Sequence, residues 1–117
     1  MKKHNFRNLI IYKRSVAFAV EIYRLTKTFP KEELYGLTGQ IRRAVTSIAL
    51  NIAEGSGNSS EKEFRRFLEI SLRSDYEVMT CLEIALLLGY CAPKDHNRLI
   101  AEADEIAAMI NGFARSL

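Results

Sequence analysis

Apolar residues recur along this chain at helical spacing. In the stretch from Gln40 to Gly55 they follow one another at steps of four, three and four residues, which places them on one face of a helix. These residues are Ile41, Val45, Ile48 and Ile52. Three other segments have a similar period, and none alternates between apolar and polar residues as a half-buried strand would. The pattern therefore predicts amphipathic helices throughout.

Helix-ending residues separate the first two of these segments. The first helix is predicted over about Leu9–Phe29, because Pro30 follows and the residue before a proline avoids the helical region. The second helix is predicted over about Leu37–Gly55, where Gly55 is suited to a left-handed cap. The residues between these two helices are expected to form a short connection.

The third and fourth helices have their own boundary signals. Ser60 and Glu63 fit a capping box before a helix over about Glu61–Leu88, and Gly89 ends it. Pro93 is a favoured first-turn residue for the fourth helix. We expect the inner side of the third helix to carry Phe64, Phe67, Leu68, Ser71, Val78, Cys81, Leu82, Ala85 and Leu88.

Short connections between long amphipathic helices favour antiparallel neighbours. With 117 residues, of which 48% are hydrophobic and 26% charged, the chain has the size and composition of one ordinary domain. The predicted fold is therefore all-α, an antiparallel up-down-up-down four-helix bundle. It forms a single domain over residues 1–117, in which residues 1–8 are a basic leader that we expect to be flexible.

The second helix also carries a polar stripe. Its members are Gln40, Arg43, Ser47, Asn51 and Glu54. This mixture of short amides, a hydroxyl and charged groups can bond to itself or to another helix, whereas long charged side chains are typical of a solvent face. We expect the stripe to lie near a helix–helix contact, and the alternative is an ordinary wet face.

A shorter polar run lies on the third helix, where Ser71, Ser74 and Glu77 follow one another at three-residue steps. Burying Glu77 without a partner would be costly, so Arg42 or Arg43 is expected to pair with it. An intra-bundle or inter-subunit polar network is favoured over a ligand site.

Positive charge is concentrated at the start of the chain. Residues 1–27 hold seven basic side chains against one acidic one, whereas the remainder is mildly acidic. Such asymmetry suggests an anionic partner, and the alternative is that the basic residues only solubilise an exposed helix. The candidate nucleic-acid-binding residues, with those on the first helix expected on its outer face, are Lys13, Arg14, Arg24, Lys27, Arg42 and Arg43. Arginine is also suited to pairing with carboxylates.

Catalytic and metal-binding patterns are not found in the sequence. His4 and His96 have no partner at metal-ligand spacing apart from the neighbouring Asp95, and neither a Glu-x-x-His nor an Arg-x4–6-His motif occurs. Cys81 and Cys91 are expected to be reduced packing residues. We therefore predict a non-enzymatic protein with no catalytic residue, metal, cofactor or small-molecule substrate. No apolar run is longer than five residues, the length of Ile84–Leu88, which predicts a cytoplasmic protein with no membrane contact.

Several segments together resemble a known family. The segment Gln40–Gly55 reads QIRRAVTSIALNIAEG, and the flanking segments read IYRLTKTFP (Ile22–Pro30), EFRRFLEI (Glu63–Ile70) and LGY (Leu88–Tyr90). They resemble the signature of the small bacterial four-helix-bundle proteins first met as 23S rRNA intervening-sequence proteins. The chain departs from the family pattern at Ser56-Gly57-Asn58 and at Arg73-Ser74, where a glycine would allow closer helix approach.

The resemblance implies the same bundle fold and a homo-oligomer. A related protein, the accessory variability protein of diversity-generating retroelements, resembles a five-membered barrel, so a pentamer is expected. It also implies a partner that is structured RNA or an RNA-processing protein. The alternative is a protein-interaction scaffold or accessory subunit with no direct nucleic-acid binding.

Overall fold

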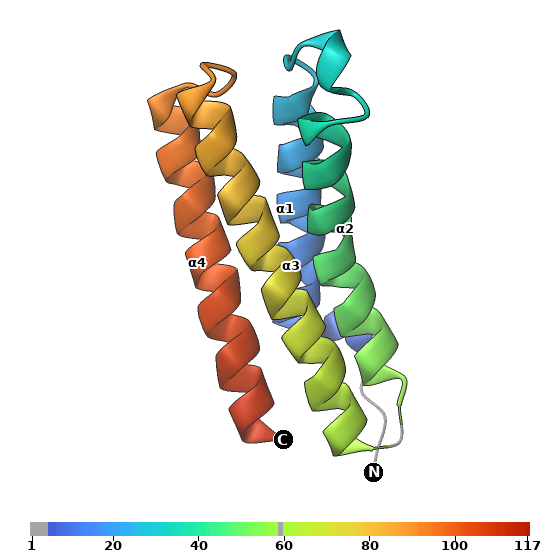
Figure 1. Ribbon diagram of the computed structural model, residues 1–117. Coiled ribbons are helices and arrows are strands. Elements are labelled where there is room, and N and C mark those ends of the chain that lie inside the picture. The colour runs from blue at the N-terminus through green and yellow to red at the C-terminus, as the bar shows by residue number, and fades with distance from the viewer. Residues whose placement is uncertain (1–4, 59) are drawn as a thin grey trace.

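The computed structural model describes residues 5–58 and 60–117. They form the helices α1 (Ile10–Thr26), α2 (Leu37–Ser56), α3 (Glu61–Leu87) and α4 (Pro93–Ser116), with 3-10 turns at Phe6–Asn8 and Lys31–Glu33. Consecutive helices run in opposite directions, so α1 begins at the end of the bundle where α4 finishes (Figure 1). No strand occurs among the described residues. The predicted all-α four-helix bundle is confirmed.

One apolar core lies between the helices. The α2 residues of the predicted stripe, Ile41, Val45, Ile48 and Ile52, are all fully buried. Helix α4 contributes a second buried row, which contains Leu99, Ala103, Ile106 and Ile110. Burying a large aliphatic side chain contributes roughly 1.5–3 kcal/mol. Since α2 and α3 pack together most extensively, we take this pair to be the centre of the fold.

Helix α1 ends earlier than predicted, at Thr26 rather than Phe29. The amides of Thr28 and Phe29 donate to the carbonyls three residues before them, at 3.2 and 3.1 Å. This tighter turn places Phe29 in the core, where its ring lies 5.5 Å from the ring of Tyr90. Pro30 does stop the helical segment, but it follows this turn and not the last residue of α1.

The predicted left-handed cap at Gly55 is wrong. Gly55 lies inside α2, and a Cβ built on it would be 2.8 Å from the Cβ of Phe67 and 2.9 Å from Cδ1 of Phe64. The glycine is therefore needed for close approach of α2 to α3. Among the described residues only Gly89 has a positive φ, of 78°, and it ends α3 as predicted.

The start of α3 has half of the predicted capping box. The Ser60 hydroxyl accepts a hydrogen bond from the Glu63 amide at 3.3 Å. The Glu63 carboxylate instead accepts from Arg66 at 2.9 Å. On the expected inner side, Leu88 is 54% exposed because it follows the last turn of α3, and Phe67 is half-buried.

Part of the predicted leader is packed. Residues 1–4, which include Lys2, Lys3 and His4, lie outside the described residues. Phe6 lies edge-on against Tyr12 of α1, with 5.0 Å between the ring centroids. Phe6 also lines the groove between α1 and α2.

Candidate nucleic-acid and oligomer interface

An apolar groove of about 830 Å³ runs between α1 and α2. Val16, Val20 and Tyr23 line it from α1 and are each about two-fifths exposed, at 39%, 43% and 42%. From α2 it is lined by Ala49, Ala53 and the 61% exposed Leu50. A continuous apolar surface of this kind is typical of a site where another molecule binds.

The groove contains two cationic side chains, Arg24 and Lys27. Lys27 also lines a smaller hollow of about 270 Å³, together with Lys31 and Arg42. The ion pairs found within the described residues involve none of these four cations. Four basic groups are thus available at one end of the α1–α2 surface, and we call them the basic cluster.

Arg42 is the member of the basic cluster that is held in place. Its Nε donates to the Thr26 hydroxyl at 2.8 Å, and its Nη2 donates to the Tyr23 carbonyl at 3.4 Å. The guanidinium carbon lies 4.8 Å from the centre of the Tyr23 ring, a distance suited to a cation–π contact. Since these contacts leave the remaining guanidinium N–H groups unassigned, Arg42 combines a defined position with spare donors.

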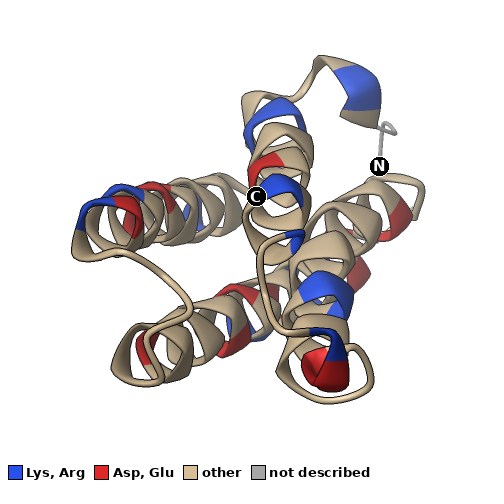
Figure 2. Ribbon diagram, turned by 90° about the horizontal axis from the view of Figure 1, so that it is seen from above, with Lys and Arg blue, Asp and Glu red and all other residues tan. Residues whose placement is uncertain are grey.

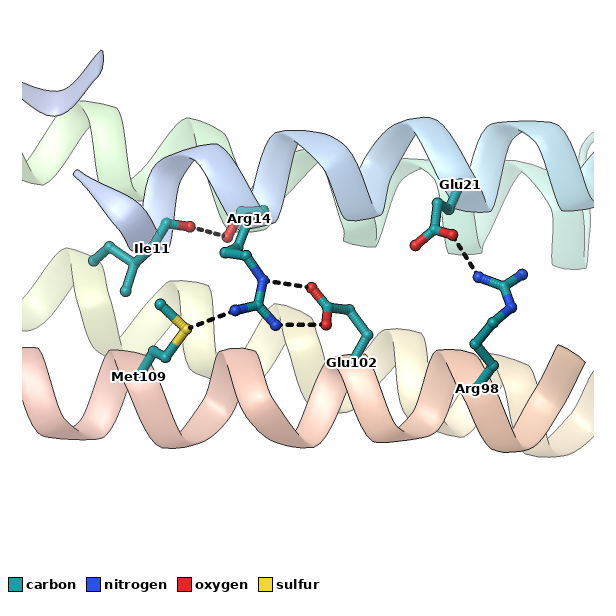
Figure 3. A network of polar contacts seen from close by, with 7 residues as sticks. Ile11, Arg14, Glu21, Arg98, Glu102 and Met109 are labelled. Atoms are coloured by element: carbon teal, nitrogen blue, oxygen red, sulfur yellow. Dashed lines mark hydrogen bonds and ion pairs between the residues drawn. The ribbon is translucent and has the colours of Figure 1, made fainter. Parts of the chain in front are cut away.

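Arg14 is bound within the bundle. Its Nε and Nη2 donate to the two carboxylate oxygens of Glu102 on α4, at 3.0 and 2.7 Å, and the side chains point toward one another between the helices (Figure 3). The bond to Glu102 raises the pKa of Arg14. We expected Arg14 to lie free on the outer face of α1, and this prediction is wrong. Further along the same helices Arg98 pairs with Glu21 (Figure 3).

The other predicted basic residues are solvent-exposed. Lys13 lies on α1 and Arg43 on α2. Along the bundle axis, basic and acidic positions are interleaved around the helices (Figure 2). The structure brings Arg24, Lys27 and Arg42 together through the surfaces they share, whereas Arg14 turns toward α4. Lys31 completes the basic cluster and was not predicted, because in the sequence it stands in the connection between helices, directly before Glu32 and Glu33.

The polar stripe of α2 is divided between two environments. The Ser47 hydroxyl lies 2.9 Å from the Ser74 hydroxyl of α3, and Asn51 donates to the Ser47 carbonyl and hydroxyl at 2.8 and 2.9 Å. Ser47 therefore lies at the α2–α3 contact, and Asn51 bonds to it within α2. Its other members, Gln40, Arg43 and Glu54, are exposed. A role for them between subunits remains a prediction.

The acidic residue in the core is Asp75, and the predicted burial of Glu77 is wrong. Glu77 is exposed, and Arg42 binds Thr26 and Tyr23 instead of pairing with it. Asp75 is fully buried, and neither of its carboxyl oxygens has a hydrogen-bond partner among the described residues. Burial, followed by the charges of Asp104 and Glu102, raises the pKa of Asp75 to about 7.

The Arg73-Ser74 departure is accommodated without loss of packing. Arg73 points outward, with a side chain 64% exposed and 3.9 Å from Glu69, while Ser74 occupies the buried position against Ser47. The bulky charge therefore does not separate α3 from α2.

Within the described residues, His96, Cys81 and Cys91 form no cluster. His96 is buried at the start of α4, with Nε2 3.4 Å from a Glu83 oxygen. Cys81 and Cys91 are free, buried thiols, and burial raises the pKa of both. Within residues 5–58 and 60–117, no group of three or more His, Cys, Asp or Glu side chains is placed to hold a metal ion.

This geometry defines a helical-bundle protein with an open apolar groove and a basic rim. The chain belongs to the 23S rRNA-intervening sequence protein family, whose sequence model matches residues 7–112. Its fold is similar to that of a Bacteroides thetaiotaomicron protein of unknown function from the S23 ribosomal protein family. The two share 24% sequence identity with a TM-score of 0.81, over 90% of this chain and 98% of the other.

No curated protein sequence matches the chain. None of the helices in the described part of the chain has the length and apolar character required to cross a membrane.

Proposed function

We propose that this chain is a non-enzymatic, homo-oligomeric bundle protein that binds structured RNA through the basic cluster. The observation that carries the proposal is the groove between α1 and α2, which combines an apolar lining with Arg24 and Lys27. The apolar part is suited to a protein surface and the cationic part to phosphate. The two parts of the proposal therefore use adjoining regions of one face.

A second copy is the occupant of the groove that the chain itself favours. Helix α3 carries an exposed apolar row of Tyr76, Ile84 and Leu87, which are 48%, 44% and 85% exposed. Glu77 and Glu83 lie beside this row and are exposed too. Tyr76 and Ile84 also line a hollow that includes Arg73 and Thr80. The acidic groups beside this α3 surface complement the cationic end of the apolar groove.

Docking of this α3 surface into the groove of the next copy would be heterologous, since each copy would use two different surfaces. Such contacts form a ring if the rotation closes. A closed ring of five copies, which the resemblance implied, would repeat the basic cluster around the assembly. Repeated weak contacts to one RNA would then give useful avidity.

RNA binding by the basic cluster would depend on phosphate charge. Arg and Lys contacts to phosphate position a nucleic acid without reading its sequence. Arg42 is the strongest candidate within the cluster, because its guanidinium is held by Thr26 and Tyr23 while other donors remain available. We therefore expect salt-sensitive binding with little sequence preference, to which exposed Lys13 and Arg43 add charge.

Anisotropy titration of a labelled, structured RNA tests this function. Charge reversal at Arg24 and Lys27 should weaken binding at least tenfold at low salt without changing helicity, because neither side chain is in an ion pair with a described residue. Reversal of the exposed Arg115 on α4 is the matched control and should have a smaller effect. Equal effects of the two changes, or no binding by the wild-type protein, would contradict the proposal.

The groove also supports the alternative function of a protein scaffold. Its alanine-containing lining would admit a helix from a different protein, which would compete with a second copy. If wild-type protein binds no RNA at low salt yet Leu50→Asp abolishes association with a protein partner, the scaffold function replaces the RNA-binding function.

A further inference from the structure

Asp75 occupies the central position of the α3 row that faces the core. The row advances by alternating steps of four and three residues, and its other members carry no charge. They are Phe64, Leu68, Ser71, Val78, Leu82 and Ala85. Asp75 is 0% exposed, and both Oδ1 and Oδ2 lack a hydrogen-bond partner among the described residues. An ionised carboxylate in such a position would lose its hydration without compensation.

The charged groups around Asp75 add to this cost. Helix α4 presents Glu102 and Asp104, both of which disfavour a second negative charge nearby. Glu102 is itself bound by Arg14 of α1 through two hydrogen bonds, and no cation is among the groups that act on Asp75. The buried residues of α2 include no titratable side chain.

One further titratable pair lies in the contact of α3 with α4. His96 of α4 is close to Glu83 of α3. The Cys81 thiol of α3, whose pKa is raised chiefly by burial, instead faces α2, where it shares a hollow with Leu37 and Gln40. His96 is therefore the matched control position for any pH response of this contact that is assigned to Asp75.

We propose that Asp75 couples opening of the α3–α4 contact to the release of one proton. In the closed bundle Asp75 is a neutral carboxylic acid. When α4 moves away from α3, the carboxyl group meets water, loses its proton and is solvated as a carboxylate. Acidic conditions therefore hold α4 closed, and a rise in pH favours the open form.

Helix α4 is the element that such a step releases. It carries Asp104 and Glu102, the two acidic groups that act on Asp75, and it is held to α1 by the Arg14–Glu102 pair and by the exposed pair of Arg98 with Glu21. The groove between α1 and α2 is lined by neither Asp75 nor the acidic groups of α4 that act on it. Displacement of α4 would thus change the α3–α4 side of the bundle and leave the proposed docking groove intact.

Hydrogen exchange of the α4 amides, corrected for the intrinsic effect of pH, tests the coupling. If the closed form titrates near pH 7 and the open form near the ordinary value of 3.8, the opening constant should rise about tenfold per pH unit between about pH 5 and 7 and then level off. Asp75→Asn cannot release the proton and should remove this dependence. The control His96→Gln should retain it.

A carboxyl-carbon NMR titration of wild-type protein provides a second test that needs no variant. Asp75 should titrate far above an ordinary aspartate. Titration near pH 4 would overturn the proposal, as would an α4 exchange profile that is independent of pH or is the same in Asp75→Asn. Loss of the pH response in His96→Gln alone would assign the effect to the histidine and likewise overturn it.

Discussion

Arg14 on α1 donates two hydrogen bonds to Glu102 on α4, which joins residues 88 positions apart in the sequence. The pair bridges the first and last helices, which contact one another less extensively than α2 and α3 do. Its parallel, two-point geometry defines how the helices are aligned as well as how close they are. An arginine expected to meet phosphate thus helps to close the bundle.

Arg14→Ala should lower the free energy of unfolding by about 1 kcal/mol, because the pair is bidentate yet remains accessible to water. The side chains of Arg14 and Glu102 are 39% and 23% exposed. Denaturant melts of Arg14→Ala, Glu102→Gln and the double variant give the coupling energy. The more exposed pair of Arg66 with Glu63 serves as the control and should couple more weakly. Equal coupling energies would show that the α1–α4 bridge stabilises the fold no more than an exposed pair within one helix does.

Ile48→Asp should unfold the protein or destabilise it by several kcal/mol, since it would place an unpaired charge in the core. Ile48 is 0% exposed at the centre of α2. Leu50→Asp provides a matched change two residues later, at a position that is 61% exposed in the groove. Circular dichroism melts should show normal helicity for Leu50→Asp only. An unchanged melting temperature for Ile48→Asp would mean that the assigned core face is incorrect.

Gly55→Ala should destabilise the bundle by about 1–2 kcal/mol, because the new Cβ would overlap the phenylalanines of α3. The closest atom is the Cβ of Phe67, at 2.8 Å, which cannot rotate away. Gly112→Ala is the matched change in α4, where a Cβ would meet nothing within 4 Å. It should stabilise the helix by up to about 1 kcal/mol. Thermal melts of both variants test this difference, and two stabilised proteins would contradict it.

Asp75 should make the folded state less stable as pH rises. Its pKa is about 7 in the folded protein against an ordinary value of 3.8, so the folded state binds more protons than the unfolded state between these pH values. The stabilising effect is complete below about pH 4 and is lost by about pH 7. At about 1.4 kcal/mol per pH unit the loss approaches roughly 4 kcal/mol, an upper limit if the core relaxes.

Urea melts from pH 4.5 to 8 can isolate this effect, because the difference between wild type and Asp75→Asn removes the contributions of the other carboxylates. The variant should gain stability over wild type as pH rises. A difference that does not vary with pH would contradict the assignment.

The sequence was sufficient for the fold because the apolar period continues through each helix. Ile41, Val45, Ile48 and Ile52 are all in the core, as their spacing predicted. Glycine was harder to interpret. Gly55 looked like a helix cap, but its role depends on Phe64 and Phe67 of the next helix, a tertiary contact that local sequence does not reveal.

The candidate site was only partly predictable. The spacing from Leu68 through Ser71 to Val78 passes through Asp75, so the buried acid could have been found by following the period instead of the residue type. The partner of Arg14 could not be predicted from the sequence, since Glu102 belongs to another helix far along the chain. The groove depends on how α1 and α2 are placed side by side, and no single helix contains it.

The most direct test of the proposed assembly is sedimentation equilibrium of the wild-type protein at tens of micromolar. We predict a homo-oligomer larger than a dimer, with five copies expected, and dissociation in Leu50→Asp, whose new charge would lie in the docking groove. Ala108→Asp on the exposed side of α4 is the control and should leave the mass unchanged. A wild-type monomer at this concentration, or an oligomer that survives Leu50→Asp, would contradict assembly through the α1–α2 groove.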